Sequence, residues 1–99
     1  MKVYGSEICS GCREFKALMA ERGFDAEFVE ITASVANLRA FLKLRDTEKI
    51  FDPIREEGRI GIPVFVSDSG EVTLDTDKAL SWIGQPPVER PETGCADCK

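Results

Sequence analysis

Two cysteines separated by two residues, Cys9 and Cys12, are the side chains of this sequence best suited to chemistry. The short apolar run before them, residues 1–4, is typical of a strand, and residues 13–22 after them have the apolar spacing of a helix. The thiols therefore stand where a strand ends and a helix begins. Unpaired backbone N–H groups and the positive end of the helix dipole favour a thiolate there. We predict a redox-active pair in which Cys9 attacks and Cys12 resolves.

The same cysteines could instead form a structural disulfide or part of a metal site. A structural disulfide needs an oxidising compartment, which nothing in the sequence indicates. Half of a zinc site is the other alternative, because C-x-x-C also begins zinc knuckles. The sequence has no histidine, so four ligands would require the distant pair Cys95 and Cys98, far beyond the usual spacing of zinc modules. The redox interpretation is therefore favoured.

Composition limits the class of protein. With 99 residues, 42% of them hydrophobic, the chain can bury the core of one domain. Its net charge of -5 argues against nucleic-acid binding, which needs a basic surface. No apolar run approaches membrane-spanning length, and the N-terminus lacks the layout of a signal peptide. We expect a cytoplasmic monomer without a nucleic-acid or membrane partner.

Apolar periodicity and turn residues predict the element order β-α-β-α-β-β-α. Such an order favours an α/β fold with a central four-stranded mixed sheet flanked by helices. Residues 1–84 are expected to form this domain, and residues 85–99 a flexible Pro-rich linker and a C-x-x-C tail. The expected strands are 1–4, 24–31, 64–66 and 71–74. The expected helices are 13–22, one from Val35 that breaks at 45–47, one from about Asp52 to Glu57, and a short last helix capped within 75–77.

Three features together resemble the glutaredoxins of the thioredoxin-fold superfamily. They are a C-x-x-C (here Cys-Ser-Gly-Cys) after the first strand, Ile62-Pro63 opening the third, and a glycine-bearing hairpin before a short capped helix. The resemblance covers residues 1–84. It implies a thioredoxin/glutaredoxin-like fold and a thiol–disulfide oxidoreductase active in electron transport and cell redox homeostasis. Cys9 would form the mixed disulfide, and Cys12 or glutathione would resolve it.

The resemblance also implies a binding site around the thiols. Pro63 matches the cis-proline beside the active cysteines, and the backbone of Ile62 would bind the main chain of a peptide or of glutathione. The start of the last helix would hold the glutamyl end of glutathione, with helix capping as the simpler alternative. These helix-start residues are Asp75, Thr76 and Asp77.

The implied partners are disulfide-bearing proteins and a source of electrons. Glutathione is the expected reductant, with a flavoprotein reductase as the alternative, and no other cofactor is required. Glutaredoxins usually carry a lysine three residues before the first cysteine, where this chain has Ser6. The candidates for the missing positive charge are Arg39, Lys43, Arg45 and Arg59.

Two further hypotheses stay open. Some glutaredoxins with a serine after the first cysteine hold a 2Fe–2S cluster, so Cys9 could be a cluster ligand next to Ser10. The protein would then be an iron–sulfur or metal-binding carrier, or a redox sensor, without turnover. The tail pair, Cys95 and Cys98, could exchange with the first pair as an accessory redox pair, or be an incidental or metal-scavenging motif.

Overall fold

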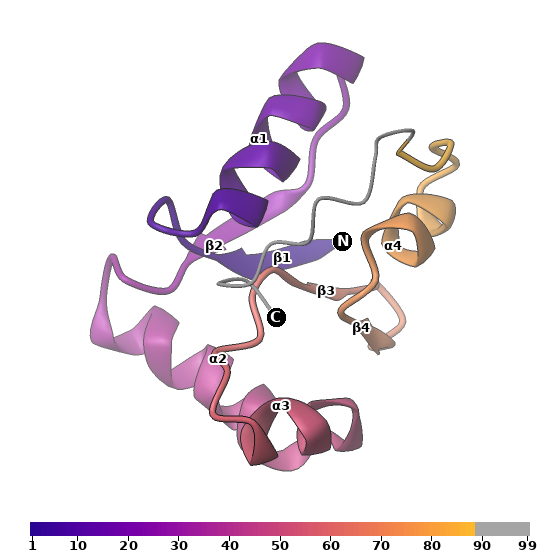
Figure 1. The fold of residues 1–99 in the computed structure, drawn as a ribbon. Coiled ribbons are helices and arrows are strands. Elements are labelled where there is room, and N and C mark those ends of the chain that lie inside the picture. The colour runs from indigo at the N-terminus through magenta and orange to yellow at the C-terminus, as the bar shows by residue number, and fades with distance from the viewer. Residues whose placement is uncertain (89–99) are drawn as a thin grey trace.

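Four short strands form one mixed sheet at the centre of the molecule (Figure 1). The structure is a computed structural model, and it describes residues 1–88. The strands are β1 (Lys2–Gly5), β2 (Glu27–Glu30), β3 (Val64–Val66) and β4 (Val72–Thr73), in the spatial order β2-β1-β3-β4. β1 pairs with β2 in parallel, whereas the β1–β3 and β3–β4 pairs are antiparallel. The observed element order matches the predicted one.

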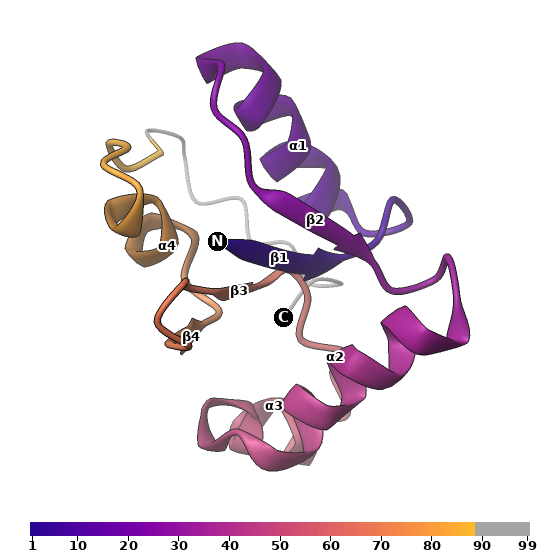
Figure 2. The same cartoon turned by 180° about the vertical axis from the view of Figure 1, so that it is seen from behind.

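Helices cover both faces of this sheet (Figures 1 and 2). Successive side chains of β1 point to opposite faces, so Val3 and Tyr4 belong to different cores. Val3 packs with the helices α1 (Ser10–Arg22) and α4 (Thr76–Trp82). Tyr4 packs on the other side, which is covered by α2 (Val35–Thr47), the 3-10 turn η1 (Lys49–Phe51) and α3 (Asp52–Glu56). The predicted α/β class is confirmed, and the arrangement is compatible with a thioredoxin-like fold.

Aromatic pairs fill the two cores. On the α1 side, the rings of Phe15 and Phe65 meet edge to face with centroids 5.0 Å apart. On the α2 side, Phe41 and Phe51 meet edge to face at 6.2 Å, and both side chains are fully buried. These pairs fix how each helical layer sits on the sheet. They anchor α1, which carries the thiols, and the segment that leads into β3.

The helix termini agree with the predicted caps more closely than with the predicted bounds. Ser34 caps α2 by accepting from the Asn37 N–H at 3.1 Å. α1 begins at Ser10 and not at Arg13, so Cys12 lies inside its first turn. The strands are also shorter than predicted, because only residues 27–30 and 72–73 of the second and fourth runs enter the hydrogen-bonded ladder.

The break predicted at residues 45–47 lies one residue later in the structure. α2 continues through Thr47 and ends only at Glu48, whose backbone is extended. Nothing in Arg-Asp-Thr prevents a helix, and the Thr47 hydroxyl donates to the Lys43 carbonyl one turn earlier at 2.6 Å. The carbonyl of Arg45 also accepts from the Arg55 guanidinium, which fastens the end of α2 to α3.

The apolar side chains of α2 are only partly buried. Phe41 is 1% exposed, whereas Val35 remains 71% exposed, and Leu38 and Leu42 about two fifths exposed. Ile50, in η1, is 36% exposed. Strands of two to four residues are too short to cover a helix of 13 residues, so part of the apolar surface of α2 stays outside the core.

The end of the described chain is bound to the domain. The Arg22 guanidinium donates to the carbonyls of Pro86 and Pro87 at 2.6 and 3.2 Å. The N–H of Val88 donates to the Asp77 carboxylate at 3.0 Å. Residues 86–88 therefore run between the end of α1 and the start of α4. Within residues 1–88, no helix has the length and apolar character needed to cross a membrane.

Candidate functional site

Cys9 and Cys12 lie at the start of α1, as the sequence predicted. Cys9 is the N-cap residue, with an extended backbone (φ -100°, ψ 127°), and Cys12 is in the first turn. Both are free thiols. Cys9 is 5% exposed and Cys12 is 0% exposed. The pair is therefore asymmetric, because any reagent that arrives from solvent meets the Cys9 side first.

The loop before β3 passes directly beside the first thiol. The Cys9 Sγ–H donates to the Ile62 carbonyl, with sulfur and oxygen 3.8 Å apart. The peptide bond between Ile62 and Pro63 is cis, as the resemblance implied, and both residues are buried. The structure thus brings together Cys9, Cys12, Ile62 and Pro63, although Cys9 and Ile62 are 53 residues apart in the chain.

Cys12 lies in a closely packed apolar environment against the end of β1. A Cβ added to Gly5 would stand 2.7 Å from the Cys12 sulfur, so only glycine leaves room for this thiol. Burial raises the pKa of Cys12 to about 12, although a hydrogen bond from the Ser6 backbone N–H acts in the opposite direction. The neighbouring Cys9 and the more distant Glu30 carboxylate raise this pKa further. Cys12 is therefore a protonated thiol at neutral pH.

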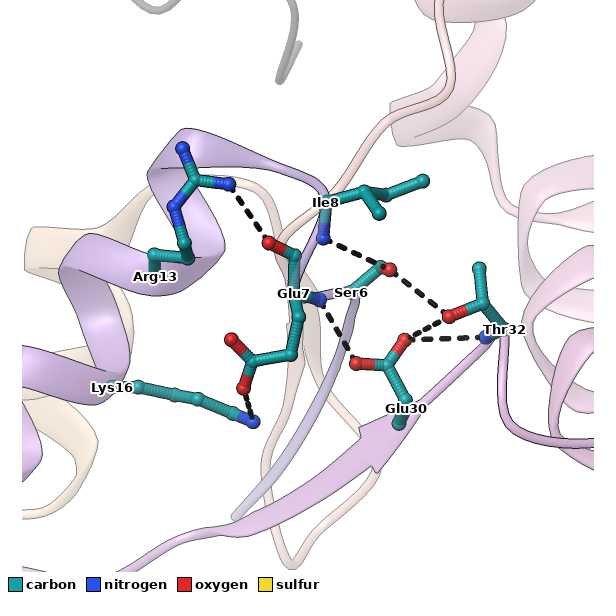
Figure 3. Close-up of polar contacts among 7 residues, drawn as sticks. All are labelled: Ser6, Glu7, Ile8, Arg13, Lys16, Glu30 and Thr32. Atoms are coloured by element: carbon teal, nitrogen blue, oxygen red, sulfur yellow. Dashed lines mark hydrogen bonds and ion pairs between the residues drawn. The ribbon is translucent and has the colours of Figure 1, made fainter.

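A polar network holds the turn between β1 and α1 (Figure 3). The Glu30 carboxylate, at the end of β2, accepts from the Glu7 N–H at 2.9 Å and from the Thr32 N–H at 3.3 Å. The Thr32 hydroxyl also donates to Glu30, and it meets the Ser6 hydroxyl at 3.1 Å. The Ser6 carbonyl in turn accepts from the Cys9 N–H at 3.0 Å. The end of β2 thus fixes the turn that carries Cys9.

The two cations on the first turns of α1 also bind this turn (Figure 3). The Arg13 guanidinium donates to the Glu7 carbonyl at 2.8 Å, and Lys16 is paired with the Glu7 carboxylate. The Lys16 ammonium also lies 4.2 Å from the centre of the Phe28 ring. Both cations therefore hold Glu7 in position.

Arg45 and Arg59, which were candidates for that missing charge, have other partners. Arg45 donates to the carbonyls of Arg59 and Ile60 at 2.6 and 3.1 Å, and so fastens this loop to α2. Arg59 forms an ion pair with Glu57 at 3.0 Å. Arg39 and Lys43 are exposed on α2, and their assignment stays a prediction.

The pKa of the Glu30 carboxyl is strongly lowered. Burial raises its pKa, but the hydrogen bonds from Thr32, Glu7 and Ser6 outweigh this effect and bring the value from 4.5 to about 2. Glu30 is therefore an ionised carboxylate in the folded protein over the whole physiological pH range. Its ionised form stabilises the fold above about pH 4.5, and this contribution is lost as the pH falls toward about 2.

Glu30→Gln is expected to lower the free energy of unfolding by about 1 to 2 kcal/mol at neutral pH, since Glu30 is partly solvated. The difference from the natural chain should shrink as the pH falls from about 4.5 to about 2. Urea denaturation across this range measures it. Glu27→Gln is the matched control, because Glu27 lies on the same strand and its carboxylate forms an ion pair with Lys2 at 3.9 Å. A gap independent of pH would contradict the charge-based explanation.

The residues predicted to hold glutathione lie at the start of α4. Asp75 is the N-cap and accepts from the Asp77 N–H at 3.0 Å, so the capping role is realised. Phe65 is paired with Thr73, and this register puts Asp75 at the same end of the sheet as Pro63. Thr76 begins the helix, and Asp77 binds Val88. The glutathione-binding role of these residues stays a prediction.

The remaining predicted residues concern the tail and metals. Cys95 and Cys98 lie outside the described residues. Within residues 1–88, no cluster of three or more Cys, Asp or Glu side chains has the arrangement of a metal site. The role of Cys9 as a cluster ligand stays a prediction.

Comparison with known proteins shows a similarity to a bacterial protein. A protein of Haemophilus influenzae, described as an uncharacterized protein, is 36% identical over 76 residues, which are 77% of this chain and 88% of that protein. This chain belongs to the same family. No protein-family model and no solved structure matches the chain. Membership of this family thus leaves the chemistry to be argued from the site itself.

Sequence reasoning missed the residues that organise the turn. Ser6 was noted only for the lysine that it replaces, and neither Glu30 nor Thr32 was singled out. A signal was present in residues 28–32, where a carboxylate and a hydroxyl interrupt the end of an apolar strand. Parallel pairing of that strand with β1 places Glu30 beside Gly5 and therefore beside the cysteine loop.

Proposed function

We propose that this protein is a glutaredoxin-like thiol–disulfide oxidoreductase. The observation that carries the proposal is the pair of free thiols on the first turn of α1, with Cys9 at the N-cap and Cys12 fully buried behind it. Cys9 is the partner of the incoming disulfide, since Cys12 has no exposed surface and holds its proton. The two cysteines thus have different environments, as a sequential reaction requires.

The reaction is an exchange of sulfur partners. The Cys9 thiolate attacks one sulfur of the substrate disulfide, a bond forms between Cys9 and that sulfur, and the other substrate sulfur leaves as a thiolate. Cys12 then loses its proton and attacks the Cys9 sulfur, which releases the second substrate thiolate. The substrate disulfide is reduced to two thiols, and the enzyme dithiol is oxidised to a disulfide. Glutathione or a flavoprotein reductase restores the dithiol.

The test is the reduction of a glutathione mixed disulfide, coupled to NADPH oxidation. It is run once with glutathione and its reductase, and once with thioredoxin reductase. Turnover with glutathione supports a glutaredoxin-like activity. Turnover only with thioredoxin reductase would mean that this flavoprotein, and not glutathione, supplies the electrons. No turnover with either electron donor would contradict the proposal. Visible absorbance after anaerobic purification would then favour the iron–sulfur carrier.

A further inference from the structure

Hydrogen bonds fix the direction of the last described residues. The Arg22 guanidinium, in the last turn of α1, donates to the carbonyls of Pro86 and Pro87 at 2.6 and 3.2 Å. The N–H of Val88 then donates to the Asp77 carboxylate at 3.0 Å, in the first turn of α4. The chain therefore runs toward the start of α4 at the point where its described part ends.

The start of α4 lies at the same end of the sheet as Cys9. Cys9 follows β1, and Tyr4, near the end of β1, pairs with Val64, the first residue of β3. β4 is antiparallel to β3, so β4 ends and α4 begins at this same end. α1 and α4 also pack on the same face of the sheet (Figures 1 and 2). Because only β3 separates β1 from β4, the ends of these two strands are about 10 Å apart.

The sequence after Val88 is long enough to bring its cysteines to Cys9. Cys95 and Cys98 lie outside the described residues, seven and ten residues after Val88. An extended chain spans at most about 3.5 Å per residue, so these lengths correspond to reaches of about 25 and about 35 Å. Both reaches are more than twice the spacing of about 10 Å between the strand ends. A thiol of the tail pair can therefore meet Cys9 while Val88 stays bound to Asp77.

Only one sulfur of the active pair is a target for such a thiol. Cys9 is 5% exposed, whereas Cys12 has no exposed surface. When these two cysteines are joined in a disulfide, an incoming thiolate meets the Cys9 sulfur and displaces Cys12, because exchange requires access to the attacked sulfur. A target with so little exposed surface favours a thiol on an extended segment over a thiol on the surface of a folded protein.

We infer that Cys95 and Cys98 form a second dithiol that reduces the Cys9–Cys12 disulfide after each turnover, so that the external electron donor acts on the tail pair. The inference rests on the proposed function. One tail thiolate attacks the Cys9 sulfur, a bond forms between these two sulfurs, and Cys12 leaves as a thiolate. The other tail thiolate then attacks the tail sulfur of this mixed disulfide, and Cys9 leaves as a thiolate.

The exchange balances between the two pairs. The active pair gains two electrons and becomes a dithiol, and the tail pair loses two electrons and becomes the Cys95–Cys98 disulfide. The tail thiols release the protons that Cys9 and Cys12 take up. Glutathione or a flavoprotein reductase, the electron donors of the proposed function, then reduces the tail disulfide.

The experiment traps the mixed disulfide between the two pairs. In the full-length chain, Cys12→Ser/Cys98→Ser leaves Cys9 and Cys95 as the two thiols. One equivalent of oxidised glutathione should first form an adduct on Cys9, and attack by Cys95 should then release glutathione and join Cys9 to Cys95 within one chain. Intact-protein mass spectrometry follows the adduct, and peptide mapping identifies the cross-link. Cys12→Ser/Cys95→Ser tests Cys98 in the same way, and Cys12→Ser/Cys95→Ser/Cys98→Ser is the matched control, which should keep its adduct.

A synthetic peptide of residues 89–99 that carries Cys98→Ser provides the reference rate. The peptide is added to the adduct of the control chain, and its second-order rate of glutathione release is compared with the first-order rate in Cys12→Ser/Cys98→Ser. The ratio is the effective concentration of the Cys95 thiol at Cys9, which we expect in the millimolar range. In a chain with the active cysteines intact, Cys95→Ser/Cys98→Ser should slow reduction of the Cys9–Cys12 disulfide by a micromolar flavoprotein reductase at least about tenfold.

The outcomes separate the inference from the proposed function. Absence of a glutathione adduct on Cys9 in all three chains would contradict the proposed function itself. If the adduct forms but persists in both chains that keep one tail thiol, the inference is overturned. A cross-link whose yield rises with protein concentration would overturn it too, because it would join two chains. An effective concentration below about 0.1 mM would show that the tail pair does not reach Cys9.

Discussion

Cys9→Ser should reduce turnover at least about a thousandfold with either electron donor, since a serine hydroxyl is not a nucleophile without a nearby base. Cys12 cannot take over the role of Cys9. Its side chain has no exposed surface, and its pKa of about 12 keeps it protonated. The effect of this substitution should therefore be a loss of the first half-reaction.

Cys12→Ser should give the opposite result. The first half-reaction needs only Cys9, so the protein should accumulate as a mixed disulfide with one half of the substrate. Intact-protein mass spectrometry with a small disulfide and no glutathione measures this adduct. Added glutathione should remove it, because an external thiol can replace the resolving cysteine.

The background for both variants is the Cys95→Ser/Cys98→Ser chain, in which no tail thiol can resolve the adduct. An adduct of equal yield on Cys9→Ser and Cys12→Ser would contradict the assigned order of attack. Rapid release from Cys12→Ser without glutathione would do the same, because it would require a resolving thiol other than Cys12.

Features encoded by neighbouring residues were predictable from the sequence. The first 22 residues contain a short apolar segment typical of a strand, then the two cysteines with their two-residue spacer, then a segment with helical apolar spacing. This local pattern places Cys9 and Cys12 at the start of a helix. The caps Ser34 and Asp75 were predictable for the same reason, since each acts on an N–H group two or three residues away. The element order follows from these local signals, and with it the sheet.

Features that depend on sheet register were not predictable. Glu30 reaches Glu7 across 23 residues, and this contact exists only because β1 and β2 pair with Gly5 opposite Glu30. A shift of the register by one residue would turn Glu30 to the other face. The exposure of Val35 on α2 also depends on how far the sheet extends, which apolar spacing alone does not specify.

The second large expected effect concerns Gly61, which precedes the Ile62 carbonyl beside Cys9. Gly61 has φ +89°, and a Cβ there would lie 2.5 Å from the Phe51 ring and 3.1 Å from Ile54. Gly61→Ala therefore combines a left-handed backbone with overpacking of a fully buried ring. We expect a loss of about 3 kcal/mol in the free energy of unfolding, measured by chemical denaturation.

Gly70→Ala is the matched control for this effect. Gly70 has nearly the same backbone angle, φ +93°, but a Cβ there would meet no atom within 4 Å. Its substitution should therefore cost only the backbone term, about 1 kcal/mol. The difference between the two variants then isolates the contact of Gly61 with Phe51. Equal losses would show that the Phe51 ring yields freely, and would contradict a rigid packing of the loop that places Ile62 against Cys9.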